Sequence, residues 1–548
     1  MKAVLKHALA LLLVGFFVFY NFFYTGRYAE YPWWYEHVND IDATYAANTV
    51  GLLNNSELTF VYHPGATIYA LHGTVYRILA LKDPTHQRLM HLRQVRDYNQ
   101  AADVLETSTR TSRILTLLES VLFLIVFYFF LVRLGGNWFV AFLLTFYLGT
   151  SHAFLQHICM VRAEVLSLLF LFCGFYSIVC FMQKTAQPPA GWMRFLIPAG
   201  FFLGFAIFSK IQIGPPLVFS LALLVFYMVR FHPAKDYKDL SGKFYWFSLA
   251  LALVNLAFMP WWALKRPAFL TPEFLSLMPG YWREVYGPAP ESFFVPVFVS
   301  LMSLVAISAF FMVRRFIRVF RVFNLLIFGG ILSVYLILLP VSMSFAQYVE
   351  NTRRLVYAVF TNVLYGGILS HRVLNFETVE KIWNMHGQES GLLHINILYF
   401  VLLAAVLSGY RLFQKVNPKR LFYGLVLFIF GTGLTMDVLA TMRSFKLYYY
   451  YAFYSLSFLA LGLGMWLSLE CGGRLYPLVQ KFPAVFCKGA IVILGLHVFV
   501  MGFYLLSRPR ADGKSSQDPL VEYLNTRTHA PPFWRIVDEA IRRINHAS

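Results

Sequence analysis

Two aspartates lie in a polar stretch that follows the first hydrophobic segment of the chain. Asp40 and Asp42 stand in the sequence Asn-Asp-Ile-Asp-Ala-Thr-Tyr. A carboxylate beside a membrane can act as a general base, because the low-dielectric wall tunes its proton affinity. Asp-x-Asp is also a short spacing for the oxygen ligands of a divalent metal, so a metal site at Asp40 and Asp42 is a second interpretation. The third interpretation is a solvated polar loop.

Arg162 and Glu164 form a second chemical group, at the start of another hydrophobic segment. The arginine can pair with Glu164 or hold an anion, and a purely structural ion pair is the alternative. The topology predicted below places Glu164 on the same side of the membrane as Asp42. Two carboxylates at one membrane face favour a catalytic site over a packing role.

Basic and aromatic side chains add candidates for binding a phosphate or a substrate. Lys210 lies between two short hydrophobic runs, where it suits the phosphate of an anionic lipid. The alternative is a lysine whose aliphatic chain lies along apolar surface while its ammonium extends to the water at the membrane interface. The remaining candidates are Tyr62, His63, Arg353 and Arg354.

These residues must be positioned by membrane-spanning helices. The chain has 548 residues, of which 58% are hydrophobic and only 13% are charged, with a mean hydropathy of +0.59. Soluble proteins carry roughly 25% charged residues. The apolar runs reach the ~20 residues that a spanning helix needs, without the alternation typical of barrel strands. The sequence therefore predicts an all-α polytopic membrane protein.

About thirteen spans are predicted, within a membrane domain of residues 1–507. They are 8–24, 113–132, 138–157, 164–182, 195–209, 211–230, 244–260, 293–313, 324–342, 392–410, 421–439, 448–469 and 489–507. The outer segments are then the loops 25–112, 261–292 and 343–391 and a short C-terminal tail, 508–548. Within these loops we expect an interfacial helix over 61–81, an amphipathic surface helix over 87–113 and an apolar segment over 357–369 that is too short to span.

The net charge of +19 follows this topology. Most of the excess of basic over acidic residues falls in alternate short loops, the densest group being Arg314, Arg315, Arg318 and Arg321. The positive-inside rule then places the N-terminus in the cytoplasm and the C-terminus outside. Because the basic clusters follow the topology, they argue against nucleic acid as a partner. The first span lacks a small-residue cleavage site and is expected to stay uncleaved.

Three motifs, in order along the chain, resemble the GT-C superfamily of membrane glycosyltransferases. The similarity is strongest to the bacterial branch related to protein O-mannosyltransferases and the lipid A aminoarabinose transferase. The first outer loop carries Asp42-Ala43-Thr44-Tyr45 and then His63-Pro64-Gly65, separated by an expected helix and turn over 46–57. Arg162-Ala163-Glu164 resembles the Arg-x-acidic triplet that opens the fourth span. The run from Gly204 to Lys210 resembles the Gly-Leu-Ala-x-x-x-Lys element.

The resemblance implies a GT-C type fold and transfer of a sugar from a polyprenyl-phosphate donor to a glycan, lipid or protein acceptor. It implies transfer at the outer face of a membrane, expected to be a bacterial inner membrane, with inversion. Asp42, or otherwise Asp40, would be the base, and Glu164 would orient the sugar or acceptor. Lys210, with Arg353 and Arg354, would stabilise the leaving phosphate. Arg162, Tyr62 and His63 are expected to contact the substrate.

Two other classes of protein remain open at this point. A transporter or flippase of a lipid-linked or anionic amphipathic substrate should hold its charges at mid-membrane, with repeats and broken helices. No repeat is visible in the sequence. A catalytically inactive scaffold would not need the carboxylates, Lys210 and Arg162 together.

Overall fold

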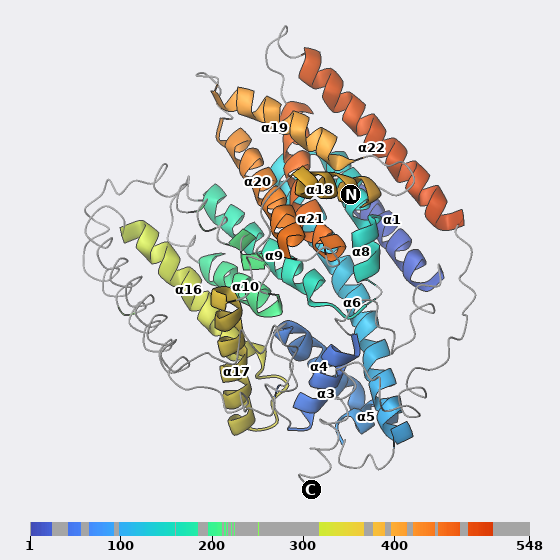
Figure 1. Ribbon diagram of the computed structural model, residues 1–548, viewed down its shortest axis with the longest axis vertical. Coiled ribbons are helices and arrows are strands. Elements are labelled where there is room, and N and C mark those ends of the chain that lie inside the picture. The colour runs from blue at the N-terminus through green and yellow to red at the C-terminus, as the bar shows by residue number, and fades with distance from the viewer. Residues whose placement is uncertain are drawn as a thin grey trace. The chain divides into compact units, whose positions relative to one another are not determined.

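The computed structural model describes most of the expected helices. The described residues are 2–24, 42–55, 58, 65–91, 98–158, 160–184, 195–210, 317–365, 376–389, 396–413, 420–443, 448–471 and 481–507, with isolated positions between 213 and 250. All regular elements among them are helices (Figure 1). The all-α membrane architecture is therefore confirmed for the described part of the chain. The chain divides into two units, residues 1–40, 111–165 and 367–522 and residues 41–110, 166–366 and 523–548, which we describe separately.

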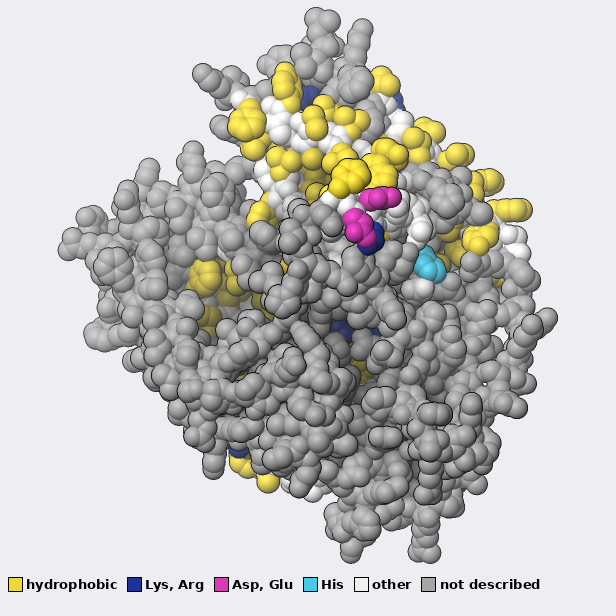
Figure 2. Space-filling view, in the orientation of Figure 1, with side chains coloured by type: hydrophobic (Ala, Val, Ile, Leu, Met, Phe, Trp, Pro, Cys, Tyr) yellow, Lys and Arg dark blue, Asp and Glu magenta, His cyan; other side chains and the backbone are white. Residues whose placement is uncertain are grey.

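The first unit is organised around α21 (Tyr448–Cys471), whose membrane-length stretch is 94% buried. Against it pack the second part of α6 (Tyr98–Gly135), α7 (Trp138–Gly149), α8 (His152–His157), α18 (Phe376–Glu389), α19 (Ile397–Phe413), α20 (Arg420–Arg443) and α22 (Lys481–Ser507). Helix α1 (Lys2–Tyr24) contacts α7, α8 and α22. By contrast, α1 and α22 expose large apolar side chains such as Leu12 and Phe499. Hydrophobic side chains cover much of the described surface of this unit in Figure 2, as expected where helices meet lipid.

The second unit contains α3 (Asp42–Leu53), α4 (Ala66–Ala80), α5 (Pro84–Leu89), most of α9 (Ala163–Lys184), α10 (Leu196–Ser209), α16 (Ile317–Ile337) and α17 (Phe345–Tyr365). Helix α10 packs against α16, and the two lie side by side in Figure 1. An added Cβ at Gly200 would lie 2.7 Å from the carbonyl carbon of Leu326. Small residues let the two backbones approach in this way, as is common between membrane helices. The crossing fixes α10, whose last residue precedes Lys210.

Ten of the predicted spans correspond to helices in the described part of the chain. Six helices are long and apolar enough to cross a membrane, and four shorter apolar helices accompany them. Predicted spans 211–230, 244–260 and 293–313 lie largely or wholly outside the described residues, as do loop 261–292 and tail 508–548. The total of thirteen spans therefore stays a prediction.

Two predicted boundaries were wrong. Residues 138–157 form two helices instead of one span, because the chain turns at Thr150 and the Ser151 side chain caps α8. The expected surface helix over 87–113 is instead split between α5 and α6, and α6 runs without interruption from Tyr98 to Gly135. No proline or internal glycine interrupts this stretch, so the polar segment continues directly into the span.

Two of the stretches expected to form helices in the outer loops are helical, and their interfacial position stays a prediction. The interfacial helix predicted over 61–81 is α4, and the helix and turn predicted over 46–57 are α3 and the turn at Asn54 and Asn55. The apolar segment predicted over 357–369 is not separate, since its described part is the second half of the amphipathic helix α17. Its first half carries the polar residues that contact the first outer loop.

Candidate active site

The start of α4 meets the end of α10. The Gly65 N–H donates a hydrogen bond to the Ser209 carbonyl over 3.0 Å, and the hydroxyls of Thr67 and Ser209 lie 2.5 Å apart. Gly65 precedes α4 and takes a left-handed conformation with φ +48°. Two motifs that are about 145 residues apart in the sequence are thereby joined, because Lys210 follows Ser209 directly.

Lys210 lies at the C-terminal end of α10 in an extended conformation. Its N–H closes the helix by donating to the Ala206 carbonyl over 3.1 Å. Only 1% of the residue is exposed. A buried ammonium is stable only among anionic or hydrogen-bonding groups, and its electrostatic effect is strong where water is excluded. This environment suits a contact with a phosphate.

Helix α3 packs its first turns against the same loop. Asp42 is the first residue of α3, and Tyr45 lies one turn later. An added Cβ at Gly65 would lie 2.8 Å from Cδ1 of Tyr45 and closer still to Cε1, so the ring covers the glycine directly. Tyr45 is 4% exposed and also packs on Tyr69, with 6.0 Å between the ring centroids. The start of α3, Gly65 and Lys210 therefore share one region of the second unit.

Helix α17 holds the connection between α3 and α4 from another side. The buried Asn351 accepts a hydrogen bond from the Leu58 N–H over 2.7 Å. The Gln347 amide donates to the Leu52 carbonyl over 2.8 Å, and Arg354 donates to the Leu58 carbonyl over 3.3 Å. These contacts satisfy backbone groups of a segment that has no regular structure at Leu58. They fix the chain between the two predicted catalytic motifs.

The arginine pair on α17 is held by one carboxylate. Glu350 accepts hydrogen bonds from Arg353 over 3.2 Å and from Arg354 over 3.1 Å. The Arg354 side chain is 2% exposed and the Arg353 side chain 18%. Arg353 is thus the more accessible of the two for a phosphate, while Arg354 contacts the outer loop.

Arg77 ties α4 to the end of α16. Its guanidinium donates to the Pro340 carbonyl and, over 3.3 Å, to the Ser342 carbonyl. Burial lowers the pKa of the Arg77 guanidinium, but arginine starts so high that the side chain stays charged. Helix α4 is therefore anchored at its start by Ser209 and near its end by the turn after α16.

Arg162 and Glu164 lie in the first unit, where α9 begins. Their side chains are each 3% exposed and are joined by a hydrogen bond of 3.3 Å from Nη1 to Oε1. Glu164 is in the first turn of α9, where the positive end of the helix dipole favours a carboxylate. The predicted pairing is confirmed, and the catalytic role of Glu164 stays a prediction.

Several of the predicted site residues are not described. Asp40, Tyr62 and His63 lie outside the described residues, and of Asp42 only its place at the start of α3 is described. Among described side chains, no group of three His, Cys, Asp or Glu residues could hold a metal ion. The metal site predicted at Asp40 and Asp42 therefore stays a prediction.

The polar face of α17 was missed in the sequence. Gln347, Asn351 and Arg354 recur at helical spacing, which is the signal that could have shown a polar surface facing the first outer loop. The adjacent Arg353 interrupts that periodicity in the sequence.

Comparisons with known proteins bear on the resemblance. Residues 95–274 match the PMT family, described as dolichyl-phosphate-mannose-protein mannosyltransferase. The match confirms the expected resemblance to GT-C glycosyltransferases over a stretch that holds Arg162, Glu164 and Lys210. No curated protein matches the sequence significantly.

Solved structures give a weaker likeness over nearly the whole chain. One is the archaeal oligosaccharyltransferase AglB from Archaeoglobus fulgidus, in complex with an inhibitory peptide and a dolichol-phosphate, at 14% identity and a TM-score of 0.47. Another is the Archaeoglobus fulgidus oligosaccharyltransferase in its apo form, at 14% identity and a TM-score of 0.48. Each alignment covers 98% of this chain, and the chain spans 59% of the length of each structure.

Proposed function

We propose that this protein is an integral membrane glycosyltransferase that takes a sugar from a polyprenyl-phosphate-linked donor. The observation that carries the proposal is the hydrogen bond between Gly65 and Ser209, which places the start of α4 beside Lys210, while Tyr45, one turn from Asp42 on α3, packs on Gly65. The PMT match over residues 95–274 supports the same donor chemistry. A base for the acceptor and a cation for the leaving phosphate are the two groups that such a transfer needs.

The transfer is a single displacement. Asp42 takes the proton from a hydroxyl or amine of the acceptor, which attacks the anomeric carbon of the sugar. The bond from that carbon to the phosphate oxygen breaks, and its electron pair leaves with the lipid phosphate. Lys210 stabilises the charge that develops on this phosphate. Attack from the side opposite the phosphate inverts the anomeric configuration.

The other candidates have supporting roles in this proposal. Glu164, paired with Arg162, orients the sugar or the acceptor, and Asp40 is the alternative base. Arg353 is the second cation for the phosphate. Tyr62 and His63 contact the substrate from the loop before α4, and Arg354 acts on the same loop through the Leu58 carbonyl.

We infer the cellular setting from the charge pattern and the resemblance. The chain lies in a bacterial inner membrane with its N-terminus in the cytoplasm, and the transfer occurs at the outer face. The acceptor is a glycan, a lipid or a protein. Because the matched family is described by mannose and a protein acceptor, these are the first substrates to test.

The test is sugar transfer by purified protein in proteoliposomes that contain labelled polyprenyl-phosphate mannose and a peptide or glycan acceptor. Asp42→Asn should lower kcat by about 10²–10⁴-fold, the range of general-base catalysis. Lys210→Met should slow the transfer at saturating donor, since it removes a cation that acts on the leaving group. The exposed Asp103→Asn and Lys82→Met variants are matched controls and should keep wild-type rates.

A flippase would give a different result in the same vesicles. Movement of the lipid-linked sugar between leaflets, with no product formed on any acceptor, would contradict the proposal. Wild-type turnover by Asp42→Asn would remove Asp42 from the role of base.

A further inference from the structure

A pocket lies in the first unit, between α18 and the start of α19. It has a volume of about 360 Å³, within the size range of small-molecule sites. Its lining consists of Trp383, Asn384, Gly387, Gln388, Asn396 and Tyr399. None of these residues belongs to the site proposed above.

The lining combines two aromatic rings with three side-chain amides and holds no charged residue. The rings of Trp383 and Tyr399 stand at 88° to each other, with 4.7 Å between their centroids. Aromatic faces carry partial negative charge and attract the C–H groups of a ring laid against them. Amides both donate and accept hydrogen bonds, which suits hydroxyl groups. A phosphate or an ammonium would find no counter-charge among the lining residues.

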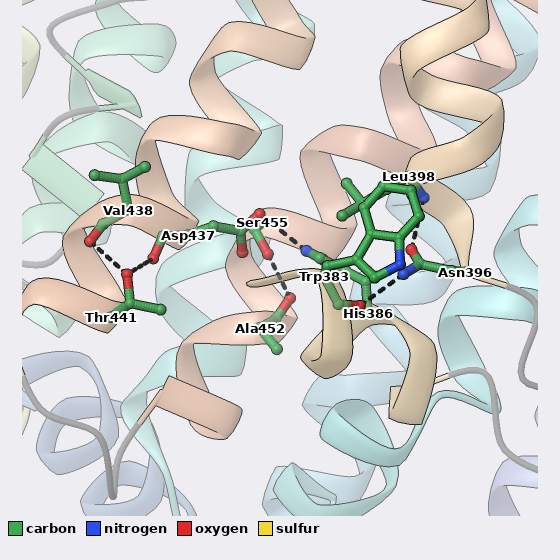
Figure 3. A network of polar contacts seen from close by, with 9 residues as sticks. All are labelled: Trp383, His386, Asn396, Leu398, Asp437, Val438, Thr441, Ala452 and Ser455. Atoms are coloured by element: carbon green, nitrogen blue, oxygen red, sulfur yellow. Dashed lines mark hydrogen bonds and ion pairs between the residues drawn. The ribbon is translucent and has the colours of Figure 1, made fainter. Parts of the chain in front are cut away.

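Asn396 is already oriented for such contacts. Its amide nitrogen donates to the Trp383 carbonyl over 2.6 Å, and its oxygen accepts from the Leu398 N–H over 2.9 Å (Figure 3). Each of these amide atoms has one further hydrogen-bond position. The residue therefore joins the two helices and keeps capacity for a ligand.

The pocket-lining residues of α18 lie on the face of the helix opposite its buried residues. Residues 383, 384, 387 and 388 lie on one face of the helix, and the buried Ile382, Met385 and His386 lie on the other. His386 Nε2 lies 2.9 Å from Asp437 Oδ2 of α20, and both side chains are fully buried. Figure 3 shows the imidazole directed toward Asp437. This contact is a specific tether that fixes the orientation of α18.

We propose that this pocket is a carbohydrate-binding site, in which an uncharged sugar ring lies against Trp383 and Tyr399 with its hydroxyls on the side-chain amides. The predicted topology puts α18 in outer loop 343–391, on the side where transfer is proposed. The lining of the pocket supports carbohydrate binding by itself, whereas the choice of mannose as probe and the source of the sugar rest on the proposed function. The sugar comes either from the lipid-linked donor or from a glycan acceptor.

The test measures binding of methyl α-mannopyranoside and mannobiose to the full chain in lipid nanodiscs by saturation-transfer NMR. The Gly387→Leu substitution places a bulky side chain in the pocket. An added Cβ at Gly387 has the Asn396 amide nitrogen as its nearest described neighbour, at an ordinary contact distance of 3.8 Å, so the substitution itself causes no clash at Cβ. Leucine is also a better helix former than glycine, so α18 should persist. Gly409→Leu on α19, with nothing within 4 Å of the added Cβ, is the matched control.

We expect wild-type protein and Gly409→Leu to bind the glycosides, and Gly387→Leu and Trp383→Ala to bind them at least tenfold more weakly. Displacement by polyprenyl-phosphate mannose would assign the pocket to the donor sugar, and binding that this lipid leaves unchanged would assign it to an acceptor glycan. No binding to wild-type protein, or equal binding to Gly387→Leu, would overturn the proposal. If the protein transferred sugar but bound no glycoside, only the proposed carbohydrate site would be overturned. If the protein bound the glycosides but transferred no sugar, the result would count only against the proposed function.

Discussion

The Gly65→Ala substitution should slow sugar transfer about 10²-fold, while the protein still folds. Gly65 has φ +48° and ψ 17°, a left-handed conformation that costs an L-residue about 1–2 kcal/mol. The new Cβ would also lie 2.8 Å from Tyr45 Cδ1, whereas ordinary contacts begin at 3.4 Å. The ring or the loop must therefore move by more than half an ångström.

Such a movement of the Tyr45 ring or of the backbone at Gly65 would displace groups that the proposed reaction needs. Tyr45 is one turn from Asp42 on α3, and the Gly65 N–H holds the carbonyl of Ser209, next to Lys210. A misplacement of about 1 Å at a catalytic site can cost about 10²-fold in rate. We expect the loss mainly in kcat, since the reacting groups lose their alignment.

The assay is the initial rate of transfer in proteoliposomes, with size-exclusion and thermal-unfolding profiles as measures of folding. Gly136→Ala is the matched control, because Gly136 also has a positive φ of +71° but has nothing within 4 Å of an added Cβ. It should carry a similar backbone strain and keep wild-type transfer. If Gly65→Ala transferred sugar as fast as Gly136→Ala, the inferred convergence of Tyr45, Gly65 and Lys210 would be refuted.

Three further predictions concern the elements that hold the site. Asn351→Ala should lower the free energy of unfolding by about 1–3 kcal/mol, because the substitution removes the acceptor of the buried Leu58 N–H. Asn351→Asp keeps an acceptor oxygen and should restore most of the lost stability. Equal melting temperatures of wild type and Asn351→Ala would contradict this role of Asn351. Gly200→Ala should lower the melting temperature, because the added Cβ separates α10 from α16. Gly15→Ala should leave the melting temperature unchanged, because there is open space around Gly15. An equal fall in melting temperature in both variants would contradict the specific role of Gly200. Glu164→Gln should destabilise the fold by about 3–5 kcal/mol, because the buried Arg162 loses the Glu164 carboxylate. The double variant with Arg162→Gln should regain the stability of the wild type but should not regain sugar transfer. Recovery of transfer in that double variant would leave Glu164 with a structural role only.

The helical architecture could be predicted because hydrophobic length alone specifies spans. The boundaries failed where a local signal outweighed hydropathy: Ser151 ends what looked like one span, and the absence of a breaker fuses a polar segment to α6. Hydropathy does not register either signal, since one depends on a single cap and the other on helix propensity.

The site could be predicted as a set of residue types and not as an arrangement. The sequence indicates Lys210 and the loop after Asp42 separately, but their meeting depends on the Gly65–Ser209 hydrogen bond, which has no local signature. The support from Asn351 and Gln347 depends in the same way on long-range contacts with Leu58 and Leu52. The pocket at Trp383 and Tyr399 likewise needs two helices to be placed together.

The most direct test of the proposed function is a structure of the full chain in nanodiscs with polyprenyl phosphate added. We expect phosphate density within about 3 Å of the Lys210 ammonium, the distance of a charge-assisted hydrogen bond. We also expect Asp42 to face the same space. A phosphate bound elsewhere, with the Lys210 ammonium in contact only with protein groups, would contradict the proposed function.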